Sequence, residues 1–179
     1  MLDSVRTFTA NNAVGLVGIA IPAALAIYFY LRSRRAKVPC WAVSTVRLVT
    51  DRVSALPDIQ IRYKDQAIQQ LSVSRVTFYN KGAETIRRED IPRTSPLRIV
   101  AANRVAMLDA SLVATNNPTN AITVAFDAPS NLAVVSFDYL DRSNGCVVEV
   151  IHTGSGPKDI RLEGTIIGAR EAPFSNLWH

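Results

Sequence analysis

Histidine is scarce in this chain, and its scarcity limits the chemistry that the side chains can support. The two histidines are His152, within "VEVIHTG", and His179. A general base or a hydrolytic triad needs a histidine beside a nucleophile and an orienting partner. Because His152 stands alone at the end of an apolar run, we interpret it as a hydrogen-bonded structural side chain rather than as a general base.

Metal, phosphate and acid/base sites are not indicated either. Cys40 and Cys146 lie far apart, and no Cys/His pair has the spacing of a metal site. The segment "GSGPKD", residues 154–159, lacks the Walker spacing and the Lys-Ser/Thr pair of a phosphate loop, so we expect a hairpin turn. The acidic residues are scattered. The sequence therefore predicts no catalytic residue, no metal and no cofactor, and an enzyme is the least favoured class.

Charge is unevenly spread, which raises the question of an anion-binding surface. Residues 81–104 hold six Lys or Arg and three acids, whereas residues 105–141 hold four acids and no Lys or Arg. The basic stretch is either a solvated loop with local Glu–Arg pairs or a patch, formed by Arg87, Arg88 and Arg93, that faces anionic lipid, nucleic acid or a phosphorylated ligand. No aromatic residues interleave with these arginines, so nucleic acid is not an expected partner.

An apolar segment near the N-terminus predicts where the rest of the chain lies relative to a membrane. Residues 13–31 are nineteen residues without a charge. As a helix they would cover about 28 Å, close to the hydrocarbon thickness of a bilayer. Tyr28 and Tyr30 lie at the end of the segment, where aromatic residues favour the interface. A secretion signal is the weaker alternative, because arginines follow where small residues would mark a cleavage site.

A basic cluster follows this segment and predicts its orientation. The cluster consists of Arg32, Arg34, Arg35 and Lys37, whereas Arg6 alone precedes the segment. Lys and Arg beside a span stay on the cytoplasmic side, so we expect the N-terminus outside and the remaining residues in the cytoplasm. Attraction of the cluster to lipid headgroups is the additional interpretation. Two cysteines form no disulfide framework, and free thiols agree with a reducing compartment.

The remaining chain alternates apolar and polar residues in short runs separated by turn residues. This period indicates strands, for example at 41–50, 71–80, 96–101, 121–126, 132–140 and 146–154. We expect residues 58–63 to pair with 71–80 through a tight turn, and Asn144–Gly145 to form a hairpin. Residues 104–115 permit either a helix turn or a strand, and we favour a strand. The fold prediction is a mainly β protein, an antiparallel β-sandwich or small barrel preceded by one transmembrane helix.

Two longer stretches resemble a known group of sequences. "LSVSRVTFYNKGAETIRREDIPRTSPLRI" and "VVSFDYLDRSNGCVVEVIHTG" look like parts of uncharacterised bacterial proteins with N-terminal spans and a β-rich domain. The shared features are a strand that ends in "N-x-G" and a later "FDYL…G…HTG" segment. The layout alone is similar to that of the membrane-plus-β-barrel effectors of anti-phage systems, which bind a signalling nucleotide and then disturb the inner membrane.

These observations predict the organisation and the function together. The expected parts are a short N-terminal segment 1–12, a transmembrane helix 13–31, a basic linker 32–40, a β-rich domain 41–169 and a tail 170–179. We expect a single-pass protein of the bacterial inner membrane whose β-domain binds or senses a partner protein or small ligand. The alternative is a defence effector that forms a homo-oligomer on ligand binding and permeabilises the bilayer, since Ala20 and Ala24 have the small-xxx-small spacing of packed spans.

Overall fold

The computed structural model describes residues 21–29, 36–49, 62–63 and 66–169. The chain forms two compact units, Met1–Arg35 and Ala36–His179. Residues 21–29 of the first unit are helical, and each of them is exposed. The other residues of the predicted span, 13–20 and 30–31, lie outside the described residues. No helix within the described ranges is long and apolar enough to cross a membrane, so the fold prediction is confirmed only for its β-rich part.

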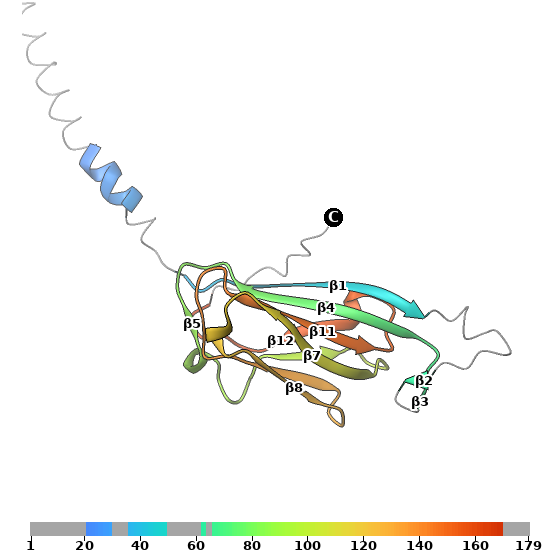
Figure 1. The fold of residues 1–179 in the computed structure, drawn as a ribbon. Helices are drawn as coiled ribbons and strands as arrows, with labels where there is room; N and C mark the ends of the chain where they lie inside the picture. The colour runs from blue at the N-terminus through green and yellow to red at the C-terminus, as the bar shows by residue number, and fades with distance from the viewer. Residues whose placement is uncertain (1–20, 30–35, 50–61, 64–65, 170–179) are drawn as a thin grey trace, which may run out of the picture. The chain divides into compact units, whose positions relative to one another are not determined.

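Two four-stranded antiparallel sheets build the second unit. Figure 1 shows β1, β4 and β11 side by side in the first of them. The first sheet has the order β1-β4-β11-β7, and the second has the order β12-β6-β9-β8. The strands of the first sheet are β1 (Pro39–Val49), β4 (Leu71–Asn80), β7 (Met107–Thr115) and β11 (Gly145–His152). Those of the second are β6 (Arg98–Ala101), β8 (Thr123–Asp127), β9 (Leu132–Ser136) and β12 (Ile160–Glu163). The structure is therefore mainly β with antiparallel sheets, in agreement with a β-sandwich.

Short elements complete the unit. Two small two-stranded ladders join β2 (Arg62–Tyr63) to β3 (Gln66–Ala67) and β5 (Ile86–Arg87) to β10 (Tyr139–Leu140). Three single 3-10 turns follow or precede strands, namely η1 (Arg88–Asp90), η2 (Pro118–Asn120) and η3 (Pro157–Asp159).

Alternation along the strands produces the core. In β4 the even-numbered residues are buried and the odd-numbered ones lie on the outer face, as period two requires. Val76 and Phe78 thus meet apolar residues of the second sheet in one continuous cluster. Each such side chain contributes about 1.5–3 kcal/mol by leaving water. The buried members of this cluster are Val76, Phe78, Ile86, Leu97, Ile99, Met107, Ala110, Ile122, Ala133, Val135, Phe137, Leu140, Cys146, Val148, Val150, Ile160 and Leu162.

Several predicted strands coincide with observed ones. β4 begins and ends at the predicted residues, 71 and 80. Residues 107–115 form strand β7 rather than a helix. β1 begins at Pro39, so its first two residues belong to the segment 32–40 that was predicted as a linker. The reason lies in the backbone of residues 36–38, which packs on the turn after β4: Lys81 N donates to Val38 O at 2.8 Å, and Glu84 N donates to Ala36 O at 3.3 Å.

Two strand pairings differ from the predictions. The described part of the stretch 58–63, β2, pairs with β3, while β4 pairs with β1 and β11. The predicted strand 132–140 is divided, because β9 ends at Ser136 and β10 pairs with β5 instead of continuing the same ladder. The sequence period was correct here, but it carries no information about which strand lies beside which.

The Asn144–Gly145 hairpin was also predicted wrongly. β11 begins at Gly145 and pairs with β4 and β7, and the positive φ that a tight turn needs lies at Ser143, at 66°. A Cβ on Gly145 would lie 2.2 Å from Phe78 O and 2.6 Å from the Cβ of Tyr79. Glycine is therefore required here because β11 passes close to the backbone of β4, and not because a turn needs a left-handed residue.

Asn80 connects the segments around the end of β4. Its side chain is fully buried, and Oδ1 accepts from Gly82 N at 2.9 Å and from Val38 N at 3.4 Å. Its Nδ2 donates to Glu84 O at 2.8 Å and to Leu140 O at 3.0 Å. The "N-x-G" end of this strand is thus a structural junction, since the amide of Asn80 satisfies four backbone groups from three different segments.

Candidate functional site

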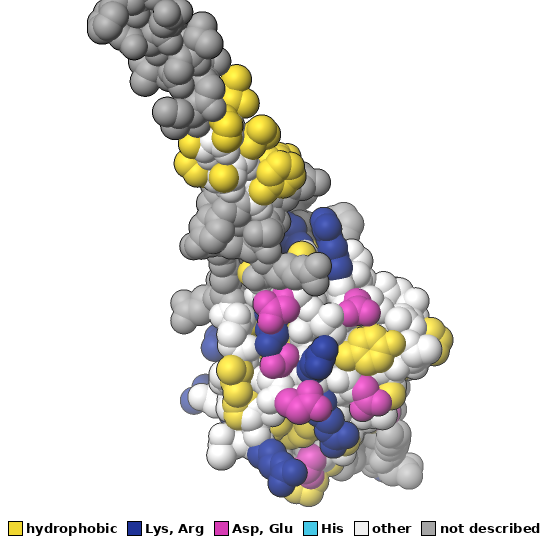
Figure 2. Space-filling view, turned by 90° about the vertical axis from the view of Figure 1, so that its left-hand side faces the viewer, with side chains coloured by type: hydrophobic (Ala, Val, Ile, Leu, Met, Phe, Trp, Pro, Cys, Tyr) yellow, Lys and Arg dark blue, Asp and Glu magenta, His cyan; other side chains and the backbone are white. Residues whose placement is uncertain are grey.

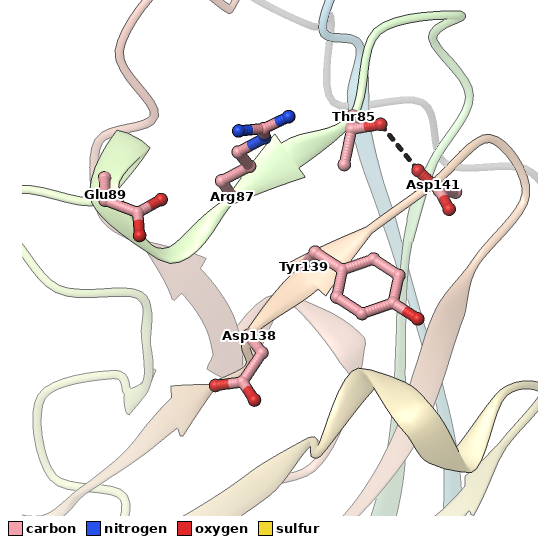
Figure 3. Close-up of a pocket in the computed structure, with 6 residues that line it drawn as sticks. All are labelled: Thr85, Arg87, Glu89, Asp138, Tyr139 and Asp141. Atoms are coloured by element: carbon pink, nitrogen blue, oxygen red, sulfur yellow. Dashed lines mark hydrogen bonds between the residues drawn. The ribbon is translucent and has the colours of Figure 1, made fainter.

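An open hollow of about 400 Å³ lies beside the β5–β10 ladder. Its lining residues are Thr85, Arg87, Glu89, Asp138, Tyr139 and Asp141, which Figure 3 shows. The ladder exists because Ile86 and Leu140 face each other and are fully buried. Since side chains alternate along a strand, their neighbours Arg87 and Tyr139, which also pair, point away from the core.

Local hydrogen bonds hold part of this lining in place. Thr85 Oγ1 donates to Asp141 Oδ1 at 2.5 Å, and the Tyr139 hydroxyl lies 2.7 Å from Thr119 Oγ1. The backbone also ties the two sides together, because Arg88 N donates to the Asp138 carbonyl at 3.0 Å. The rim of the hollow is therefore ordered by the fold before any ligand binds.

Carboxylates outnumber the guanidinium in the hollow. Glu89, Asp138 and Asp141 are acidic, and Arg87 is the single basic residue of the lining. Within the described residues, no ion pair joins Arg87 to these acids. The arrangement presents hydroxyl groups, acceptor oxygens and one planar donor, which suits a polar ligand with hydroxyl or cationic groups better than a phosphate.

The predicted arginine patch contributes one residue to the hollow. Arg87, Arg88 and Arg93 are all exposed, but Arg87 alone lines the hollow. On the face of the β-domain in Figure 2, Lys and Arg side chains lie among Asp and Glu side chains. Whether the three arginines together bind an anionic surface stays a prediction.

Sequence analysis missed the acidic half of this hollow. Asp138, Tyr139 and Asp141 lie about fifty residues after Arg87 in the chain, and a pairing between β5 and β10 brings the two stretches together. The available signal was the contrast between a basic stretch, 81–104, and an acidic stretch, 105–141. Opposite charge alone did not indicate which residues of the two stretches would meet.

Lys37 is the one member of the predicted basic cluster within the described residues. Its Nζ lies 2.6 Å from Asp90 Oδ1 and 3.7 Å from Glu84 Oε1, with 11% of the side chain exposed. Burial tends to raise the pKa of Asp90, but hydrogen bonds from Lys37 and from Arg87 N outweigh it and lower that pKa. Lys37 is thus paired within the β-domain, whereas Arg32, Arg34 and Arg35 lie outside the described residues.

His152 is buried and hydrogen-bonded, as predicted. Its Nε2 lies 2.7 Å from Ser74 Oγ, and its Nδ1 accepts from Gly154 N at 3.0 Å. Burial lowers the pKa of His152, while the charge of Asp159 opposes this effect. With no exposed surface, the imidazole cannot contact a substrate in this structure.

The segment 154–159 is a turn but not the predicted hairpin, because it leads from β11 in the first sheet to β12 in the second. Ser155 N and Gly156 N both donate to Asp159 Oδ2, at 2.6 and 3.0 Å. An internal carboxylate thus occupies the backbone donors that a bound phosphate would need.

The two cysteines are free and buried. In the part of the chain that the structure describes, no group of three or more His, Cys, Asp or Glu residues is placed to hold a metal ion.

Comparisons with known proteins found no relative of this chain. No protein-family model matches the chain, and no curated protein and no solved structure is similar to it. The hollow is therefore interpreted from its own residues.

Proposed function

We propose that this chain is a single-pass protein of the bacterial inner membrane whose β-domain is a binding or sensing module. The observation that carries the proposal is the surface of the helix at residues 21–29. It has no charged residue, and its large side chains Ile21, Leu25, Ile27, Tyr28 and Phe29 are each at least half exposed. Such a surface is costly in water and favourable in lipid, and the uncharged stretch around it has the length of a span.

The hollow beside β5 and β10 is the proposed ligand site. Glu84 N donates to Ala36 O, and the next residue, Thr85, lines the hollow. The arginines after the proposed span favour the cytoplasm, so the hollow would take a ligand that is present there.

Membrane insertion and orientation form the first test. The full chain, expressed in a bacterium with a reporter fused after residue 179, should stay in the membrane pellet at alkaline pH and report a cytoplasmic C-terminus. A variant that carries Ile21→Lys and Ile27→Lys should leave the membrane, because each charge in a span costs about 2.5–3.5 kcal/mol on insertion scales. Release of the unaltered chain, or a C-terminus outside the cytoplasm, refutes the anchored module.

The ligand site is tested separately by photo-crosslinking in cells. A photoreactive amino acid replaces Tyr139 in the hollow, and the matched control replaces Val113, an exposed residue of β7 that does not line the hollow. A discrete adduct from position 139 that is absent from position 113 supports the site. Equal labelling at both positions refutes the site. Adducts between copies of the chain, together with loss of membrane potential, would favour the effector instead.

A further inference from the structure

The turn between β11 and η3 is fastened to the first sheet through His152. Gly154 N donates to His152 Nδ1 at 3.0 Å, and Ser72 Oγ donates to Gly154 O at 2.6 Å. Arg47 Nε donates to the carbonyl of Ser155. Strands β1, β4 and β11 therefore each contribute one side chain that holds this turn.

The hydrogen bonds fix the protonation state of the imidazole. A backbone N–H can only donate, so Nδ1 of His152 must accept and carries no proton. The single ring proton then lies on Nε2 and is donated to Ser74 Oγ, 2.7 Å away. Ser74 Oγ lies 2.6 Å from Thr45 Oγ1 and can donate its own hydroxyl proton to that oxygen. The whole chain of bonds requires the neutral ring.

Close packing leaves the turn no room to adjust while it stays attached. A Cβ on Gly154 would lie 2.8 Å from His152 Nδ1 and 2.6 Å from Asp159 Oδ2. If Nδ1 acquired a proton, two donors would face each other across 3.0 Å, and the contact would become repulsive. The imidazole is fully buried, so water cannot take the place of the lost acceptor.

We propose that His152 is a proton-sensitive clasp, whose protonation at Nδ1 releases Gly154 and opens the turn at residues 153–159. The turn leads through η3 directly into β12, an edge strand of the second sheet. Protonation of His152 at low pH would thus loosen the segment that attaches β12 to the edge of the second sheet. It is independent of the ligand proposed for the hollow, because no residue of the clasp lines that hollow.

The charged groups around His152 are few, and their effects are defined. Asp159 is the acidic group that raises the pKa of His152, and burial outweighs it, so the ring favours the neutral state. From β1, Arg47 reaches the carbonyl of Ser155. The nearest charged residues of β4 and β7, Arg75 and Asp109, occupy register positions on the opposite, outer face of the sheet. Around the turn, Lys158 of η3 and Arg161 of β12 are exposed.

Hydrogen exchange of the full chain in detergent micelles tests the clasp. After correction for the intrinsic pH dependence of exchange, protection of the amides of residues 153–156 and 158–159 should fall by up to tenfold per pH unit below about pH 6.5, since opening is linked to one proton. His152→Asn is the decisive variant, because an asparagine oxygen accepts from the N–H two residues on without titrating. His179→Gln removes the other histidine and should behave like the unaltered chain.

The outcomes separate the clasp from general acid unfolding. Protection that falls in the unaltered chain and in His179→Gln, but stays level in His152→Asn, supports the proposal, provided that the amides of β4 remain protected throughout. A turn whose protection is independent of pH overturns it, as does an equal loss in His152→Asn or a parallel loss in β4. The imidazole ¹⁵N spectrum of the unaltered chain needs no variant: the proton should lie on Nε2 at pH 7.5, and Nδ1 should titrate with the same midpoint as the loss of protection. A different midpoint also refutes the clasp.

Discussion

Replacement of Asn80 by alanine should destabilise the β-domain more than an ordinary polar substitution. Asn80 makes four side-chain hydrogen bonds to backbone groups, and its side chain is fully buried. In Asn80→Ala the N–H of Gly82 and the carbonyl of Leu140, both in buried bonds, lose their partner. The N–H of Val38 and the carbonyl of Glu84 are only partly buried, and water can reach them.

The magnitude follows from the two buried groups. A buried donor or acceptor without a partner costs about 1–3 kcal/mol, so two of them predict a loss of about 2–6 kcal/mol in the free energy of unfolding. For a domain of this size, a loss near 3 kcal/mol corresponds to a fall of roughly 10 °C in the midpoint of thermal unfolding. This is a large fraction of the stability of a typical domain.

The matched control is Asn116→Ala. Asn116 also joins two backbone groups, since its Nδ2 donates to Ser143 O at 2.6 Å and its Oδ1 accepts from Gly145 N at 3.0 Å, but the residue is exposed. Water can replace its amide, so the expected cost is about 1 kcal/mol or less. Urea unfolding is followed by fluorescence of Trp41, which packs against the core, in a Trp178→Phe background. If Asn80→Ala shifts the midpoint no further than Asn116→Ala, the junction described here does not stabilise the fold.

Three further predictions rest on single contacts. Gly82→Ala should cost about 1–3 kcal/mol in urea unfolding, because the new Cβ would lie 2.0 Å from Ala36 O, whereas Gly156→Ala, with nothing within 4 Å, should cost almost nothing. Burial raises the pKa of Cys146 to about 11, so its thiol should react with a disulfide reagent at pH 8 only after unfolding; reaction in the folded chain would contradict this burial. The pKa of His152 is lower in the folded than in the unfolded chain, so stability should be level above about pH 7 and fall as the pH drops below about 6.5, by at most about 1.4 kcal/mol per unit; the same slope in His152→Asn would assign it to other groups.

The strands could be predicted because their information is local. Period-two alternation and turn residues are properties of neighbouring positions, and β4 begins and ends at the predicted residues, 71 and 80. Pairing is not local. β5 and β10 have two residues each, and no periodic pattern can be recognised over such a length. The ladder depends on Ile86 and Leu140 meeting in a core that both sheets complete.

Glycine gave the clearest case in which the residue was right and the reason was wrong. Asn-Gly predicts a tight hairpin because glycine tolerates positive φ. Gly145 is instead needed for space, since the backbone of β11 passes the carbonyl of Phe78. The positive φ of this loop lies one residue before Asn144, at Ser143. A dipeptide motif is therefore ambiguous between a conformational and a steric requirement, and only the neighbouring strand distinguishes them.

The sign of the charge in the candidate site depends on the same long-range pairing of strands. Along the sequence, Arg87 belongs to a basic stretch, which suggested an anionic ligand. In the fold, it lies with Asp138 and Asp141, because β10 pairs with β5. Electrostatic attraction acts over about 8–10 Å in physiological salt, so the residues that matter to a ligand are those close in space and not those close in sequence. A patch counted along the chain therefore keeps its charge only if no acidic segment from elsewhere pairs with it, and here β10 brings Asp138 and Asp141, which flank it, beside Arg87.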